Sequence, residues 1–188
     1  MRKILTRLLF LFALFLSHLT FSQSKELAKF ILPGYEIRDT LCGDLNADGR
    51  MDVLLILKAL DEDTLPGDKV MTRPLLILIR QADGNLKLEA RNDDAVLCKQ
   101  CGGAFGDPYT NMVITGDYFS VEHYGGSSSR WTDIVTFKYN PSKKNWFLHK
   151  WGGEVINNNY PESNSNWLKT TKEFGVVLFE KFNRDGSK

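Results

Sequence analysis

The sequence predicts a mainly β protein built from antiparallel, hairpin-connected sheets, as a sandwich or a propeller-like fragment, with one short N-terminal helix. Strand-length apolar or alternating runs recur along the chain, turn signals separate neighbouring runs, and no helix-period segments alternate with them. The 188 residues, 43% hydrophobic and 25% charged, suit one folded domain rather than a disordered chain.

The first 22 residues have the pattern of a secretory signal peptide. Residues 1–7 carry three basic side chains and no acid, residues 8–16 are unbroken apolar, and small residues stand at positions −3 and −1 before a cut after Ser22. The apolar run is shorter than the roughly 20 residues of a membrane span. We therefore expect a secreted or periplasmic protein with residues 23–188 as a single domain; an uncleaved N-terminal anchor is the alternative.

Charge excludes one class of partner. Residues 1–22 hold three of the 24 basic residues and none of the 23 acidic ones, so the formal charge of the mature chain is −2. No basic patch typical of nucleic-acid binding remains. We expect neither a nucleic-acid partner nor a membrane span in the mature chain.

The mature chain begins with a predicted helix over residues 24–32, where apolar residues fall at i, i+3 and i+4. Pro33 and Gly34 end it. Strands are then predicted over residues 35–41, 53–57, 75–79, 86–90, 112–115, 118–124, 131–139, 146–151 and 174–182.

The first four strands differ in burial. Residues 53–57 and 75–79 are continuous apolar runs, which predicts burial on both faces. The acidic residues 61–63 between them are interpreted as a solvated loop. Asp83-Gly84 is a hairpin signal, and residues 86–90 beyond it alternate, so this strand should have one wet face.

The later strands are separated by turn and loop signals. Gly116-Asp117 predicts a second two-residue hairpin, and Asn140-Pro141-Ser142 a turn. The Gly/Ser residues 125–129 predict a flexible loop. The asparagine-rich residues 157–166 predict a polar loop before the last strand.

Residues 44–52 have the spacing of a calcium-binding loop. Short oxygen-bearing side chains occupy loop positions 1, 3, 5 and 9, and Gly49 permits the sharp turn that brings them together. Calcium takes six to eight oxygen ligands, whereas magnesium requires a smaller octahedral shell. The predicted ligands are Asp44, Asn46, Asp48, the backbone carbonyl of Arg50, and Asp52. An Asx-turn without an ion is the alternative.

The loop is not an EF-hand, because position 12 is Leu55 rather than a bidentate Glu and a strand follows it. Residues 43–54, Gly-Asp-Leu-Asn-Ala-Asp-Gly-Arg-Met-Asp-Val-Leu, resemble the repeat unit of FG-GAP/VCBS proteins, the family typified by integrin α-chain propellers. The resemblance covers only residues 43–58. It implies calcium held between two strands of a propeller blade by the five groups named above.

A whole propeller is not expected. The mature chain is too short for the four blades of four strands that closure needs. We expect instead a standalone β domain with one such loop, in which calcium has a structural role.

Cys98 and Cys101 form a Cys-x-x-Cys motif. In an exported protein we expect a structural disulfide between them. The alternatives are a disulfide from Cys42 to either one, a redox pair, and a zinc site that recruits Cys42 and His123.

The residues around the Gly/Ser loop offer a candidate ligand surface. They combine an imidazole, a phenol, a guanidinium and an indole, which suit contact with a sugar or a peptide. The residues are His123, Tyr124, Arg130 and Trp131. Ordinary aromatic packing at strand ends is the alternative.

The leading hypothesis for function is a non-enzymatic, exported, calcium-binding module that binds a protein or a glycan. The sequence contains neither a Gly-x-Ser-x-Gly nor a His-Glu-x-x-His motif, and no catalytic residue or organic cofactor is predicted. The alternative is a secreted hydrolase that uses His123, Ser127–Ser129 and Asp133.

Overall fold

The computed structural model describes residues 25–64 and 70–185, so the predicted signal peptide lies outside the described residues. The chain divides into two compact units, residues 1–33 and 34–188. In the first unit, residues 25–28 are helical and the chain turns at residues 29–30, which makes the predicted helix shorter than expected. None of the helices in the described ranges is long and apolar enough to cross a membrane.

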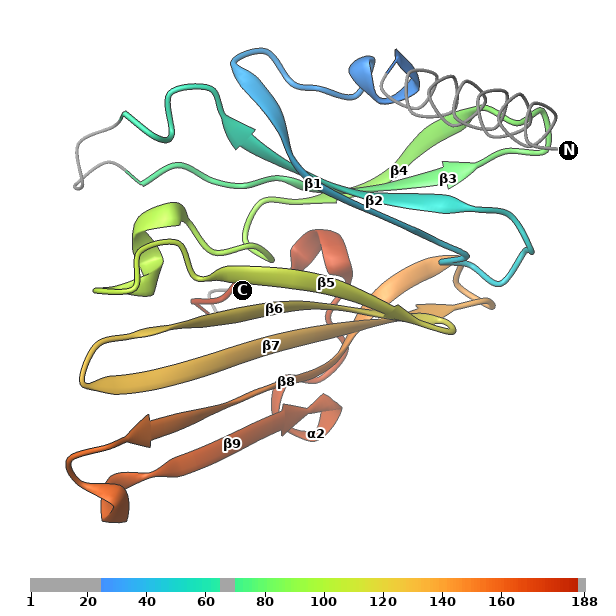
Figure 1. The fold of residues 1–188 in the computed structure, drawn as a ribbon. Coiled ribbons are helices and arrows are strands. Elements are labelled where there is room, and N and C mark those ends of the chain that lie inside the picture. Colours follow the sequence, from blue (N-terminus) through green and yellow to red (C-terminus); the bar gives the residue numbers. More distant parts are fainter. Residues whose placement is uncertain (1–24, 65–69, 186–188) are drawn as a thin grey trace, which may run out of the picture. The chain divides into compact units, whose positions relative to one another are not determined.

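The second unit contains two antiparallel sheets (Figure 1). The four-stranded sheet has the order β1 (Tyr35–Gly43), β2 (Asp52–Ala59), β3 (Leu75–Arg80) and β4 (Leu86–Asn92). The five-stranded sheet has the order β5 (Tyr109–Thr115), β6 (Tyr118–Gly126), β7 (Ser129–Asn140), β8 (Asn145–Asn157) and β9 (Ser165–Thr170). Within each sheet every strand pairs with its neighbour in sequence, so the prediction of a mainly β, hairpin-connected antiparallel fold is confirmed.

One hydrophobic core takes side chains from both sheets. Leu54 and Ile56 of β2 belong to it, as do Phe119 of β6 and Phe137 of β7. The rings of Phe119 and Phe137 stack with centroids 5.2 Å apart. β2 and β3 are buried along nearly their whole length, as their continuous apolar runs predict.

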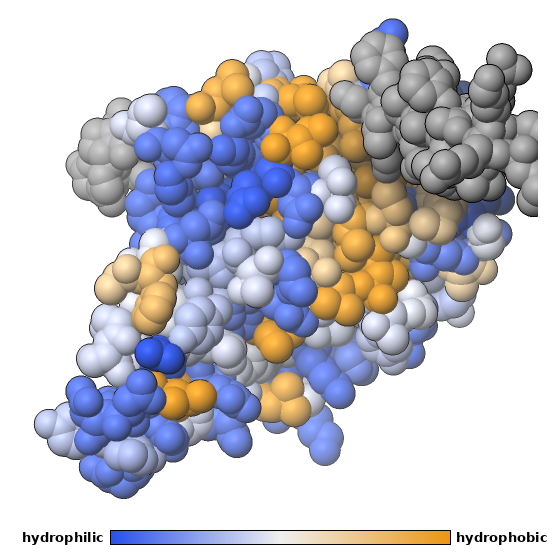
Figure 2. Space-filling view, in the orientation of Figure 1, coloured by the Kyte–Doolittle hydropathy of each residue, from blue (hydrophilic) through white to orange (hydrophobic). Residues whose placement is uncertain are grey.

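The edge strands β1 and β5 contact each other where the sheets meet. Ile114 of β5 lies so close to Gly43 of β1 that a Cβ added to the glycine would be 2.9 Å from the Ile114 side chain. Leu41 and Ile114 also pack against the core from this seam. On the face drawn in Figure 2, apolar side chains gather beside these two strands.

The predicted last strand over residues 174–182 is wrong. Instead, the last strand is β9, which overlaps the predicted polar loop only at residues 165–166, and it is followed by the helical turn α2 (Thr171–Phe174) and the 3-10 turn η3 (Phe179–Lys181). A capping box between Thr170 and Glu173 starts α2, because each residue satisfies a backbone N–H of the first turn. Only Leu178 forms a bridge to β8, opposite Phe147.

The predicted flexible loop at residues 125–129 is also wrong. β6 extends to Gly126 and β7 begins at Ser129, which leaves a two-residue turn. Gly126 has φ 119°, and a Cβ there would lie 2.1 Å from the carbonyl oxygen of Ser129. A glycine at this position permits the tight reversal.

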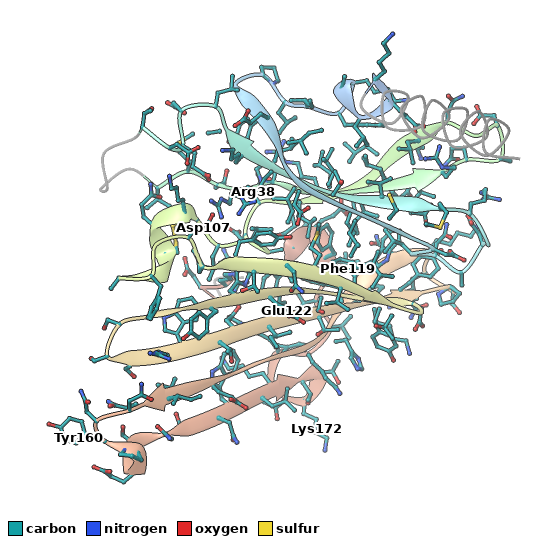
Figure 3. All side chains as sticks on the ribbon, viewed as in Figure 1. Arg38, Asp107, Phe119, Glu122, Tyr160 and Lys172 are labelled. Atoms are coloured by element: carbon teal, nitrogen blue, oxygen red, sulfur yellow. A yellow bond between two sulfur atoms is a disulfide. The ribbon has the colours of Figure 1, made fainter. Side chains whose placement is uncertain are left out.

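A buried guanidinium joins the connection between β2 and β3 to the connection between β4 and β5. Arg73 is fully buried and donates to both carboxylate oxygens of Glu62 at 2.6 and 2.8 Å. It also donates to both carboxylate oxygens of Asp107 at 2.6 and 2.8 Å, and to the Leu97 carbonyl at 3.4 Å. Arg38 reaches the same Asp107 at 3.4 Å (Figure 3). Glu62 is 2% exposed, so the prediction that residues 61–63 are all solvated is wrong for its central member.

Candidate functional site

The predicted calcium loop connects β1 to β2. Asp44 Oδ1 and Asn46 Oδ1 both accept hydrogen bonds from the Asp48 N–H, each at 3.1 Å, and Asp44 Oδ2 accepts from the Gly49 N–H at 2.8 Å. Ala47 at φ 60° and Gly49 at φ 81° give the backbone its tight curl. The side chains at loop positions 1 and 3 therefore converge on one point of the turn.

Arg50 differs from its predicted role. Its guanidinium contacts Asp48 Oδ2 at 2.5 Å, and its Nε donates to the Arg80 carbonyl at 2.7 Å. Asp48 Oδ1 accepts from the Arg50 N–H at 2.9 Å. The Arg50 side chain thus supplies a positive charge beside the acidic loop, whereas the sequence predicted only its carbonyl as a participant.

Asp52, the first residue of β2, lies fully buried at the base of the loop. Its Oδ2 accepts from the Leu45 N–H at 2.9 Å and its Oδ1 from the Arg80 N–H at 2.8 Å. Burial raises the pKa of the Asp52 carboxyl, against the lowering effect of these two donors, and the charges of Asp48 and Asp44 raise it further. Asp52 therefore connects the loop to the end of β3.

The loop fits calcium by the chemistry of its donors. Within residues 25–64 and 70–185, no three His, Cys, Asp or Glu side chains are grouped as a metal site. The loop, however, offers a mixed set of hard oxygens, namely three carboxylates, one amide and one backbone carbonyl, and calcium prefers such oxygens. The groups that would hold the ion are Asp44, Asn46, Asp48, Asp52 and the carbonyl of Arg50.

The predicted disulfide between Cys98 and Cys101 is present. Because the sulfur atoms of Cys98 and Cys101 are bonded to each other, neither can pair with Cys42 or bind zinc as a thiolate. The alternatives of a Cys42 cross-link and of a zinc site are therefore wrong. Cys98 is buried and Cys101 is exposed at the short 3-10 turn η1 (Lys99–Gly102). The bridge closes a tight loop just before the entry to β5.

The predicted ligand surface is divided between two faces of the sheet. The register of β6 on β7 places His123 and Trp131 on one face and Tyr124 and Arg130 on the other. His123 is 2% exposed. The four residues therefore do not form one surface.

Phe105 joins Tyr124 and Arg130 on the outer side. The Phe105 and Tyr124 rings have centroids 5.5 Å apart, and the Arg130 guanidinium lies 5.6 Å from the Phe105 centroid. Phe105 is 48% exposed and Tyr124 37%. We call Phe105, Tyr124 and Arg130 the aromatic cluster. Sequence reasoning missed Phe105 because it lies in a Gly-rich loop without periodicity.

His123 is held inside a polar network. Its Nε2 accepts from the Leu97 N–H at 3.1 Å, and its Nδ1 lies 3.5 Å from Asp133 Oδ1 and 3.3 Å from Arg184 Nη2. Asp133 also accepts from Arg184 at 2.5 Å and from the Trp151 indole at 2.7 Å. With Nε2 as an acceptor, the imidazole is neutral and carries its proton on Nδ1.

The hydrolase alternative lacks its triad in this geometry. His123 and Asp133 do lie together, but the Nε2 that a general base would use already accepts from a backbone N–H. Gly126 is three residues beyond His123 along β6, which corresponds to about 10 Å at 3.3 Å per residue. Ser127–Ser129 lie beyond that point, at the tip of the hairpin.

The His123 network predicts acid sensitivity. Burial lowers the pKa of His123, while its hydrogen bond to Asp133 opposes the shift. An unfolded chain binds a proton on this imidazole near pH 6.5 and the folded chain does not, so the free energy of unfolding should fall as the pH drops from 7 to 5. Urea unfolding at both pH values should show a larger loss for the wild type than for His123→Gln, whose amide oxygen can still accept from Leu97. Equal losses would contradict this role.

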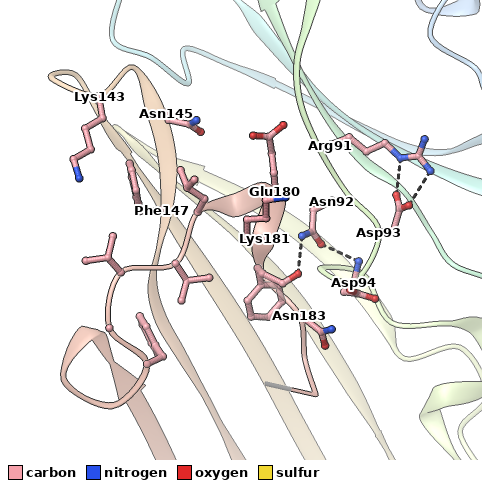
Figure 4. A pocket seen from close by; sticks show the side chains of 16 residues that line it. Arg91, Asn92, Asp93, Asp94, Lys143, Asn145, Phe147, Glu180, Lys181 and Asn183 are labelled. Atoms are coloured by element: carbon pink, nitrogen blue, oxygen red, sulfur yellow. Dashed lines mark hydrogen bonds and ion pairs between the residues drawn. The ribbon is translucent and has the colours of Figure 1, made fainter. Parts of the chain in front are cut away.

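An open groove of about 1280 Å³ lies between the end of β4, the start of β8 and residues 174–183 (Figure 4). Arg91 and Asp93 form an ion pair at its rim. Asn92 donates to the carbonyls of Phe179 and Phe182 at 2.7 and 2.8 Å, and its Oδ1 accepts from two backbone N–H groups. Asn92 therefore fastens the C-terminal segment to β4.

Comparison of the chain with protein-family models, curated proteins and solved structures finds no match. Function is therefore inferred from the residues themselves. Of the residues predicted for a site, Asp44, Asn46 and Asp48 lie in one turn with Asp52 at its base in β2, and those of the ligand surface separate.

Proposed function

We propose that this chain is an exported β-rich binding module that holds calcium at residues 44–52. The observation that supports the proposal is the curl of the loop, in which Asp44 and Asn46 accept from the same backbone N–H of Asp48. The calcium ligands are Asp44, Asn46, Asp48, Asp52 and the carbonyl of Arg50. A divalent cation among these groups offsets the mutual repulsion of their carboxylates.

The role proposed for calcium is structural. The loop joins β1 to β2, and Asp52 extends its contacts to β3 through the Arg80 N–H. An ion bound by the folded chain and not by the unfolded chain raises the free energy of unfolding by linkage. Because Arg50 contacts Asp48 at 2.5 Å, its guanidinium would have to share or release this carboxylate when calcium binds.

Thermal melting of residues 23–188 in EDTA and in calcium tests the proposal. For a loop with a dissociation constant of about 10⁻⁴–10⁻³ M, calcium at about ten times that value should add ~1.4 kcal/mol. The melting temperature should then rise by about 3–6 °C in a domain of this size, and magnesium should do less.

Asp48→Ala should remove the calcium response, while Asp61→Ala, which removes the same charge from another exposed loop, should keep it. The calcium proposal fails if the wild type melts at the same temperature in EDTA and in calcium.

The ligand surface proposed for this module is the aromatic cluster, in place of the four residues expected from sequence. Its two exposed rings offer flat apolar faces to a sugar or a peptide, and Arg130 offers hydrogen-bond donors beside them. His123 and Trp131 support this hairpin from its inner face. A Cβ on Gly125 would lie 2.4 Å from the Trp131 ring, so the indole packs directly on that glycine.

A further inference from the structure

We propose a second binding site, for the sulfate or carboxylate groups of an acidic polysaccharide, in the hollow beside the turn between β7 and β8. The choice of a polysaccharide rests on the proposed role of the chain as an exported binding module. The site itself rests on charge, shape and side-chain positions that do not involve the calcium ligands.

Positive charge is concentrated in this part of a chain whose mature form is slightly acidic. Residues 136–172 contain two acidic residues against six lysines, which are Lys138, Lys143, Lys144, Lys150, Lys169 and Lys172. Both acids, Glu154 and Glu162, lie outside the set of residues that line the hollow. A local excess of cations of this kind attracts anionic ligands.

The hollow has a volume of about 580 Å³ and is lined by both polar and apolar residues. Lys138, Lys143 and His149 are among the residues that line it, with Asn140 and Ser142 of the turn beside them. Asn140 Oδ1 accepts from the N–H groups of Ser142 and Lys143 at 3.0 and 3.1 Å, which shapes the turn that carries Lys143.

Two aromatic rings position the lysines without neutralising them. Lys138 Nζ lies 4.6 Å from the centroid of Tyr118, and Lys143 Nζ lies 5.3 Å from the centroid of Phe147. A cation over a ring face is attracted to it and keeps its full charge. Asp117 is the acidic residue among those lining the hollow, and its contact with Lys138 is a loose 3.7 Å.

The pKa of His149 responds to the same positive charges. Its ring lies 5.0 Å from that of Tyr118 in an edge-on contact. Partial burial lowers the pKa of His149, the charges of Lys150 and Lys138 lower it further, and Asp117 opposes them. An oxyanion bound here would favour the protonated imidazole.

The outer face of the sheet suits an extended polyanion better than a single ion. Arg130 and Lys138 lie eight residues apart on the same face of β7, which corresponds to about 26 Å. The aromatic cluster is at one end of this face and the hollow at the other. Two acidic residues lie between them on this face and oppose the attraction, Glu122 on β6 (Figure 3) and Glu154 on β8.

Binding of dextran sulfate, with uncharged dextran of the same length for comparison, tests the site at about 0.15 M ionic strength. The wild type should bind the sulfated polymer and not the neutral one. The Lys138→Gln/Lys143→Gln variant should bind it at least about tenfold more weakly. Lys87→Gln/Lys99→Gln, which removes the same charge elsewhere, should change binding by less than about twofold. Equal weakening by both variants would mean diffuse attraction and would overturn the site.

Two further measurements identify the ligand class. NMR titration of His149 with and without dextran sulfate should show a raised pKa in the complex, and binding should tighten as the pH falls. An unchanged His149 pKa, or binding to phosphatidylglycerol vesicles without binding to dextran sulfate, would overturn the proposal.

The two proposals can fail separately. The Lys138→Gln/Lys143→Gln variant should retain the rise in melting temperature with calcium. Asp48→Ala should retain dextran sulfate binding while it loses that rise. Loss of dextran sulfate binding in Asp48→Ala would contradict the assignment to the lysines.

Discussion

Arg73→Met should lower the free energy of unfolding by about 3–5 kcal/mol, because it leaves a buried carboxylate without its partner. Arg73 is fully buried and Glu62 is 2% exposed, so water cannot replace the lost contacts at low cost. The guanidinium makes five hydrogen bonds, to Glu62, Asp107 and the Leu97 carbonyl. Its removal also breaks the buried link between the β2–β3 and β4–β5 connections, which leaves the exposed Lys99–Asp63 pair between them.

Urea unfolding of three variants tests this result. Arg73→Met/Glu62→Met removes both buried charges and should recover more than half of the loss, since paired removal of such charges is often nearly neutral. Lys87→Met breaks an exposed pair with Glu89 and should cost no more than about 1 kcal/mol. If Arg73→Met costs no more than Lys87→Met, the buried network does not stabilise the fold.

Phe179→Ala should cost about 3–5 kcal/mol, as truncation of a buried aromatic ring does. The Phe179 side chain is fully buried and contacts Phe119 and Phe137 edge-on, with centroids 5.7 and 5.0 Å apart. The residue lies in a 3-10 turn beyond the last strand, yet its ring fills the space between the sheets. The C-terminal segment is therefore part of the core.

Val176→Ala is the control for Phe179→Ala, because Val176 lies in the same segment and is 76% exposed. Val176→Ala should change the free energy of unfolding by no more than about 0.5 kcal/mol. Urea denaturation of both variants compares them directly. Similar small losses at both positions would show that residues 175–182 dock too loosely to contribute to the core.

The strands that could be predicted are those specified by local pattern. Residues 53–57 and 75–79 are apolar without interruption, and a chain of this kind is stable only when both faces are buried. Gly84 and Gly116 have positive φ at the two predicted hairpins, a conformation that glycine adopts without strain. In these places local preference and tertiary structure agree.

The C-terminal segment was mispredicted because two local signals compete there. Residues 174–182 are apolar enough for a strand, but the capping box of Thr170 and Glu173 begins a helical turn before them. The edge strand β9 comes directly before this turn and pairs with β8 on one side only. An edge strand has one partner and needs no apolar run, so its first two residues were included in the predicted polar loop and the strand itself was not predicted.

The sequence already contained the reason why the four residues of the candidate ligand surface do not lie on one face. His123 and Tyr124 are adjacent in a strand, and adjacent strand residues face opposite sides of a sheet. They therefore could not share one surface. Phe105, which does join Tyr124, carried no pattern and became visible only through the folded loop.

The sequence by itself determined the fold class, the disulfide and the spacing of the loop at residues 44–52, because each depends on residues that are near neighbours in the chain. Only the tertiary structure decided the partners of Arg73, which lie 11, 24 and 34 residues away. It also decided the burial of Glu62 and the entry of Phe179 into the core. The physical reason is that a charge or a ring is stabilised by whatever group the fold brings to it, and local pattern does not specify that group.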